Sequence, residues 1–156
     1  MDRGDYALLE AEVRESYKVV ERIYERIRQR QASFRTTEEK ADSMAYQLHN
    51  LYGAYEECFE TVARFFENRI EGARYHADLL RRMKIEIEGV RPSLLSECSY
   101  ALLDELRRFR PFFRHAYGVE LDVDRVERIV GIALQLEGVF QQDREHFLAR
   151  LRPDNE

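Results

Sequence analysis

The chain has 156 residues, of which 44% are hydrophobic and 12% aromatic, and this content is enough for one hydrophobic core and excludes wholesale disorder. Its 3 Pro and 7 Gly are too few for the turns of an all-β chain, so the expected fold class is all-α, in a single domain over residues 1–156. The net charge of −5 excludes a surface that binds nucleic acid over its whole extent through basic side chains.

The first half of the chain predicts two long helices. Apolar residues recur three, four or seven positions apart over residues 5–32, which is typical of one amphipathic helix. Thr36 and Glu39 have the spacing of a capping box, so a second helix is expected to start there. Its apolar stripe covers residues 44–66, and Gly72 is expected at its C-terminal end. The short polar connection predicts an antiparallel hairpin of these two helices.

Shorter helices are expected next. Residues 76–87 predict a helix that stops before Gly89. Ser96 is expected to cap the following helix. Pro111 should kink that helix or end it near Arg110, because proline lacks an amide donor and crowds the preceding turn.

The last helix is expected to begin at a cap provided by Asp122 or Asp124. Gly131 and Gly138 lie seven residues apart on it, which leaves a bare face that another helix could approach closely. The whole pattern predicts an all-α bundle of about five helices, with two long antiparallel helices and shorter ones that cover them.

Two observations favour a cytoplasmic protein. The longest apolar run, residues 129–134, is far shorter than the roughly 18 residues of a membrane span, and the N-terminal residues lack the sections of a signal peptide. Cys58 and Cys98 form no CxxC pair and are expected to be small core residues. We therefore expect no membrane association.

Cationic residues concentrate in one stretch of this acidic chain. Four arginines and one histidine fall within nine residues: Arg107, Arg108, Arg110, Arg114 and His115. A guanidinium offers a planar donor fork to phosphate oxygens, and an imidazole exchanges protons near neutrality, so the combination suits phosphoryl chemistry. The other histidines lack the spacing of metal ligands, and no metal or other cofactor is expected.

The same stretch carries a family resemblance. Arg110, His115 and Tyr117 form the pattern R-x-x-x-x-H-x-Y, and Gly89-Val90-Arg91-Pro92 precedes it. With these motifs the chain resembles the HEPN superfamily, specifically the HepT-like ribonuclease toxins, over most of its length. One departure is Pro111, because these proteins often have a polar residue after the motif arginine.

The resemblance implies a HEPN-type helical bundle that acts as a metal-independent endoribonuclease. It implies a homodimer in which Arg110 and His115 of both protomers face one cleft. Two symmetry-related histidines can share the two proton transfers of RNA cleavage, and an isologous interface is the commonest way to bring them together. Arg107, Arg108 and Arg114 are expected either to contact RNA phosphates or to form surface salt bridges.

The resemblance also implies a protein partner. In this family a minimal nucleotidyltransferase antitoxin attaches AMP to the tyrosine that corresponds to Tyr117. Two other readings stay open, namely a non-catalytic HEPN module that binds and scaffolds such a nucleotidyltransferase, and a plain helical interaction protein. Intact Arg110 and His115 favour the enzyme, which is the leading reading, whereas Pro111 and the acidic net charge favour the binding module.

Overall fold

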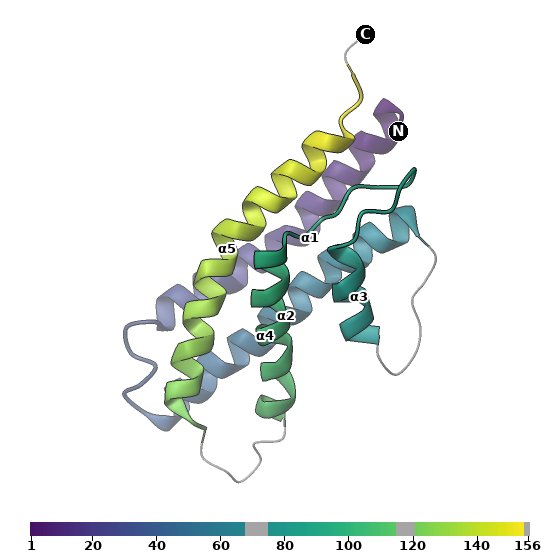
Figure 1. Ribbon diagram of the computed structural model, residues 1–156. Coiled ribbons are helices and arrows are strands. Elements are labelled where there is room, and N and C mark those ends of the chain that lie inside the picture. Colours follow the sequence, from purple (N-terminus) through teal and green to yellow (C-terminus); the bar gives the residue numbers. More distant parts are fainter. Residues whose placement is uncertain (68–74, 115–120, 155–156) are drawn as a thin grey trace.

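The computed structural model describes residues 1–67, 75–114 and 121–154, and within residues 111–114 the description covers the backbone alone. Over these ranges the chain forms five α-helices and no strand, which confirms the all-α prediction (Figure 1). The helices are α1 (Arg3–Arg30), α2 (Glu38–Phe66), α3 (Tyr75–Met83), α4 (Glu97–Arg114) and α5 (Val123–Leu151). The three long helices α1, α2 and α5 run along one another, and α3 and α4 pack against α2.

The predicted hairpin of two long helices is confirmed in α1 and α2, but α2 starts one residue later than expected. Thr37 is its N-cap, and the Lys40 amide donates to the Thr37 hydroxyl at 3.2 Å. The hydroxyl of Thr36 donates to the Ser33 carbonyl at 2.7 Å instead. The capping box of Thr36 and Glu39 is therefore wrong, because the turn between the helices uses that hydroxyl.

Two predicted helix ends are also too late. Helix α2 ends at Phe66 with Glu67 as its C-cap, and Gly72 lies outside the described residues. Helix α3 ends at Met83, because the chain turns back on itself: the amides and carbonyls of Ile87 and Arg91 pair at 2.9 and 3.0 Å. Gly89, inside this turn, has a φ of 76°, a conformation that favours glycine.

The caps of α4 and α5 agree with the sequence. The Ser96 hydroxyl accepts from the Ser99 amide at 3.2 Å and donates to Asp143 of α5 at 2.9 Å. Asp122 caps α5 by accepting from two backbone amides. Pro111 does not end α4, which continues to Arg114; a proline this close to the C-terminus removes only one backbone hydrogen bond.

One hydrophobic core joins the three long helices. The Tyr24 hydroxyl of α1 donates to the Ala133 carbonyl of α5 at 2.8 Å, and it pairs with the Tyr55 hydroxyl of α2 at 2.6 Å. Phe140 packs its ring edge against Tyr55, with 5.0 Å between the ring centroids. These contacts fix α2, the helix against which α4 lies.

The expectation for one of the two cysteines is wrong. Cys58 is buried as predicted, but Cys98 is exposed on the first turn of α4. Gly131 and Gly138 line no helix contact, since a Cβ at either position would meet no described atom within 4 Å. None of the helices in the described residues combines the length and the apolar character that a membrane span requires.

Candidate functional site

Helix α4 carries three of the predicted cationic side chains in described positions. Arg107 donates twice to Oδ1 of Asp104, at 3.1 and 2.8 Å, and Arg108 pairs with Oδ2 of the same carboxylate at 2.6 Å. One carboxylate thus binds two guanidinium groups, and the trio keeps one net positive charge. Arg108 is mostly exposed, so this charge is presented to solvent.

Arg110 lies differently, because its side chain runs toward α2. Its guanidinium carbon lies 5.4 Å from the centre of the Tyr52 ring, a cation–π contact. One terminal nitrogen lies 4.0 Å from where Gly53 would carry a Cβ. The Nε atom is buried and has no hydrogen-bond partner among the described residues. Arg110 is therefore held in place by an aromatic face while one buried donor stays available.

Tyr52 forms the other side of this contact. Its side chain is fully buried, and its hydroxyl has no hydrogen-bond partner among the described residues. Burial raises the pKa of the Tyr52 hydroxyl well above its usual range, and the charge of Glu56 raises it further. Two buried polar groups without described partners in one contact are unusual in a folded protein. This pair of groups therefore marks the candidate site.

Sequence reasoning missed Tyr52. The apolar stripe of α2 includes its neighbour Leu51, and nothing in the spacing distinguishes a core tyrosine from one that faces an arginine. Only the packing of α4 on α2 brings the Arg110 guanidinium over the Tyr52 ring. The sequence does hold one indication of this contact. Tyr52 is followed by a glycine, and Gly53 lies where the Arg110 guanidinium approaches α2.

The remaining predicted residues lie outside this description. His115 and Tyr117 fall outside the described residues, and the backbone alone places Arg114 at the end of α4. Of the predicted site residues, the structure thus describes the side chains of Arg107, Arg108 and Arg110, all on α4. Among the described residues, no group of three His, Cys, Asp or Glu side chains could hold a metal ion.

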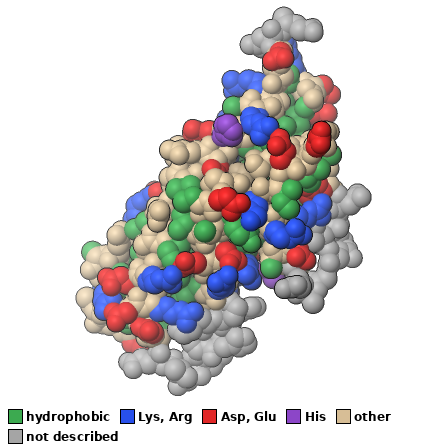
Figure 2. Space-filling view, viewed as in Figure 1, with side chains coloured by type: hydrophobic (Ala, Val, Ile, Leu, Met, Phe, Trp, Pro, Cys, Tyr) green, Lys and Arg blue, Asp and Glu red, His purple; other side chains and the backbone are tan. Residues whose placement is uncertain are grey.

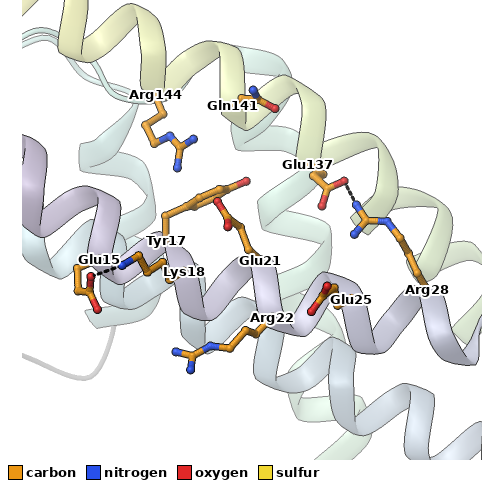
Figure 3. A pocket seen from close by; sticks show the side chains of 10 residues that line it. All are labelled: Glu15, Tyr17, Lys18, Glu21, Arg22, Glu25, Arg28, Glu137, Gln141 and Arg144. Carbon is orange, nitrogen blue, oxygen red and sulfur yellow. Dashed lines mark hydrogen bonds and ion pairs between the residues drawn. The ribbon is translucent and has the colours of Figure 1, made fainter.

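Charges elsewhere on the molecule are mixed. Figure 2 shows acidic and basic side chains interspersed over the face that it presents. A groove of about 760 Å³ lies between α1 and α5, and none of the predicted site residues lines it (Figure 3). In it Arg144 lies 3.8 Å from the centre of the Tyr17 ring, and Arg28 pairs with Glu137. Because acids and bases balance in the groove, it does not favour an anionic ligand.

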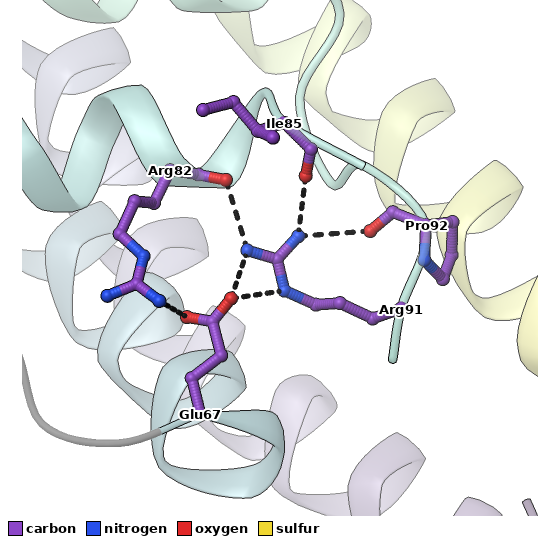
Figure 4. A network of polar contacts seen from close by, with 5 residues as sticks. All are labelled: Glu67, Arg82, Ile85, Arg91 and Pro92. Carbon is purple, nitrogen blue, oxygen red and sulfur yellow. Dashed lines mark hydrogen bonds and ion pairs between the residues drawn. The ribbon is translucent and has the colours of Figure 1, made fainter. Parts of the chain in front are cut away.

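One further charged cluster is structural. The Arg91 side chain is fully buried beside Glu67 of the α2 C-cap (Figure 4). Its guanidinium donates to Glu67 at 3.0 and 2.6 Å, and to the backbone carbonyls of Arg82, Ile85 and Pro92 at 2.9 to 3.1 Å. All five N–H donors are used. Arg91 therefore fixes the connection between α3 and α4 to the end of α2.

Comparison with known proteins finds a family that the chain matches. Residues 43–151, more than two thirds of the chain, match the model of a family described as HepT-like protein. This range includes α4, the Arg91 cluster and both partners of the contact between Arg110 and Tyr52. No curated protein and no solved structure matches the chain.

Proposed function

The chain belongs to the HepT-like protein family, and from this premise we propose that it is a metal-independent endoribonuclease toxin of a HEPN and nucleotidyltransferase toxin–antitoxin pair. Arg110 and His115 are its catalytic residues. Arg107, Arg108 and Arg114 contact RNA phosphates. The enzyme acts as a homodimer, with the motif residues of both protomers at one cleft.

The chemistry needs no group other than these side chains and RNA. The 2′-hydroxyl loses its proton to one imidazole as its oxygen bonds to phosphorus. The bond between phosphorus and the 5′-oxygen then breaks, and the leaving oxygen takes a proton from a second, protonated imidazole. Guanidinium groups stabilise the extra negative charge on the phosphorane. The products are a 2′,3′-cyclic phosphate and a 5′-hydroxyl.

The buried Nε atom of Arg110 carries this proposal. A guanidinium that serves only the fold has its donors satisfied, as Arg91 does, whereas Arg110 keeps a buried donor without a described acceptor. The ring of Tyr52 orients it without neutralising its charge. A preorganised and unneutralised cation is what a developing phosphorane requires.

Cleavage of a single-stranded RNA oligonucleotide in the presence of EDTA tests the activity. Arg110→Ala and His115→Ala should each lower the cleavage rate by orders of magnitude, because each removes transition-state charge stabilisation or proton transfer. Arg14→Ala, which removes an exposed cation of α1, is the matched control and should cleave as fast as the wild type. Loss of activity in EDTA, or cleavage by a folded His115→Ala variant, contradicts the proposal.

Control by the partner is the second part of the proposal. A cognate minimal nucleotidyltransferase uses ATP to attach AMP to Tyr117, two residues beyond His115 in the chain. The added phosphate is anionic and competes for the cations that bind RNA. Intact-mass spectrometry of the co-expressed pair should show added AMP on the peptide that contains Tyr117. If Tyr117→Phe is neutralised as well as the wild type is, control occurs by binding alone.

A non-catalytic module that binds and scaffolds the nucleotidyltransferase is the alternative. The observation that favours it is the pairing of Arg107 and Arg108 with Asp104, which leaves less free positive charge for RNA. Light scattering separates the two functions, because a shared catalytic cleft needs a dimer. A species of 18.7 kDa at micromolar concentration favours the binding module.

A further inference from the structure

A groove of about 470 Å³ lies between α1 and α2. Arg22 and Arg26 line it from α1, and Asn50, Gly53 and Glu57 line it from α2. Arg22 also lines the groove between α1 and α5, but Figure 3 shows its guanidinium pointing away from the α5 side chains. The two helices therefore present two cations and one amide along a single groove.

Gly53 places this groove next to the candidate site. One terminal nitrogen of Arg110 lies 4.0 Å from where Gly53 would carry a Cβ. Because glycine has no side chain, nothing of residue 53 separates the groove from the Arg110 guanidinium. The arginines of α1 and Arg110 of α4 thus approach the same turn of α2 from two different helices.

The two arginines of the groove are not neutralised. Both are exposed, and among the described residues neither Arg22 nor Arg26 forms an ion pair. Arg14 and Arg28 of the same helix pair with Glu10 and Glu137. Since Glu57 is the acid among the residues that line the groove, the groove keeps a net positive charge in a chain whose net charge is −5. An anionic ligand is therefore favoured here.

An exposed tyrosine extends this surface along α2. Tyr46 precedes Gly53 by seven residues, which is two helical turns, so the two residues share a face of the helix. The Arg30 guanidinium donates to the Ser43 hydroxyl at 2.8 Å, and in the antiparallel hairpin this contact puts Tyr46 toward the Arg26 end of the groove. The Tyr46 side chain is 54% exposed. An aromatic face thus lies open to solvent in line with the cations.

These features fit a single strand of RNA. Arg22 and Arg26 are one helical turn apart, with about 5–6 Å between their Cβ atoms, a spacing comparable to that of successive phosphates. Guanidinium groups bind phosphate oxygens through a planar fork, and exposed aromatic rings stack on bases. An acidic segment of a protein partner also pairs with arginines, but it gives no role to the exposed ring or to the continuity with Arg110.

We propose that this groove binds the single-stranded RNA on one side of the scissile phosphate, an inference that rests on the proposed function. Arg22 and Arg26 bind two phosphates, and Tyr46 stacks on a base. The strand continues past Gly53 to Arg110. In the proposed homodimer each protomer contributes one such groove, which leads to the shared cleft.

Binding of a fluorescent 2′-O-methyl RNA oligonucleotide, measured by anisotropy at several salt concentrations, tests this assignment. The oligonucleotide lacks the attacking hydroxyl, so the full chain binds it without cleaving it. The double variant Arg22→Gln, Arg26→Gln should bind about tenfold more weakly at low salt. The slope of log K against log salt should become shallower by about 1.4, because each phosphate contact contributes about 0.7. A loss of packing would not change this slope.

The role of Tyr46 has its own pair of variants. Tyr46→Ala should weaken binding by about fivefold or more, because a stacked base is lost. Tyr46→Phe keeps the ring and should bind like the wild type. Glu57→Gln should bind RNA more tightly than the wild type, because it removes the carboxylate from the groove.

The double variant Arg3→Gln, Arg14→Gln is the matched control. It removes the same charge from α1, but Arg3 is the first residue of the helix and Arg14 lines a groove against α5. Its salt slope should equal that of the wild type. An equal slope and affinity in the Arg22 and Arg26 variant would overturn the groove as an RNA site and leave the proposed function standing.

Two other outcomes separate the possible failures. If the Arg22 and Arg26 variant binds RNA normally but no longer binds the nucleotidyltransferase, an acidic segment of that partner occupies the groove and the RNA assignment is wrong. If the wild type binds the 2′-O-methyl strand through this groove but cleaves no unmodified RNA, the groove is supported as an RNA site and the proposed catalytic function fails.

Discussion

Two arginines of this chain, Arg91 and Arg110, show how the surroundings of a guanidinium separate a structural role from a functional one. Arg91 is fully buried, and its five donors all have acceptors. Arg110 is half-buried and stacks on an aromatic ring, and its buried Nε has no described acceptor. A saturated guanidinium contributes to the fold alone, whereas an unsaturated one keeps binding capacity for an anion.

The saturation of Arg91 predicts that even a conservative change is destabilising. Arg91→Lys keeps the charge but replaces a fork of five donors by a single ammonium group, and it leaves carbonyls and part of Glu67 buried without partners. We expect a loss of about 3 kcal/mol in the free energy of unfolding, measured by urea denaturation. Arg14→Lys on the exposed face of α1 should change it by less than about 0.5 kcal/mol. Equal effects of the two variants would show that the buried network adds nothing.

The different burial of the two cysteines predicts that their thiols differ in reactivity. Burial raises the pKa of the Cys58 thiol to about 11, so little thiolate is present near neutrality. Cys98 is exposed. A thiol-reactive dye at about pH 8 should therefore label one cysteine quickly, and the second should react only after denaturation. Peptide mapping identifies the fast site, and rapid labelling of Cys58 in the folded protein would contradict its burial.

At the scale of helices, the sequence predicts the number of helices and their apolar faces well, and their ends less well. The apolar faces can be predicted because they follow from the spacing of apolar residues along the chain. The ends depend on competition for single hydrogen bonds: Thr36 and Thr37 are both able to cap α2, and the bond of Thr36 to Ser33 decides between them. Pro111 suggests a break, but the helix tolerates it near its C-terminus.

Helix α5 offers the clearest prediction at this scale. Gly131 and Gly138 are exposed, and a Cβ at either position meets open space among the described residues. Alanine has the higher helix propensity by about 1 kcal/mol, so Gly131→Ala and Gly138→Ala should each stabilise the protein by up to this amount. Thermal unfolding monitored by circular dichroism measures the change.

Gly89→Ala is the matched control for these two substitutions. At a φ of 76° a side chain is strained, so this variant should be less stable than the wild type by about 1–2 kcal/mol. If the α5 variants destabilise the protein or change its mass in light scattering, the glycines serve a contact between protomers.

At the scale of the whole molecule, the candidate site combines a local sequence motif with contacts that form only when the helices pack. The spacing of Arg110 and His115 is a local pattern, and it was sufficient to suggest the family. The contact of Arg110 with Tyr52, like the groove that Arg26 and Gly53 line, joins residues far apart in the sequence through the packing of three helices. No periodicity in the sequence encodes such pairs.

The tyrosines of the core predict how stability changes with pH. Burial raises the pKa of Tyr17 to about 12, and it raises the pKa of Tyr24 and Tyr55 well above the ordinary value. Below about pH 9 these hydroxyls are protonated in both the folded and the unfolded chain, so they cause no pH dependence. Above about pH 10 the unfolded chain releases protons that the folded chain retains. The free energy of unfolding therefore falls as the pH rises, by up to about 1.4 kcal/mol per pH unit for each tyrosine.

Urea denaturation at about pH 8 and about pH 10.5 measures this loss of stability. The Tyr24→Phe variant tests its cause. At the lower pH it should be less stable than the wild type, because the hydrogen bonds of Tyr24 to Tyr55 and to the Ala133 carbonyl are lost. Its stability should nevertheless fall less between the two pH values, because one titrating group is removed. If the wild type and the variant lose equal stability, Tyr24 does not contribute to the loss of stability at alkaline pH.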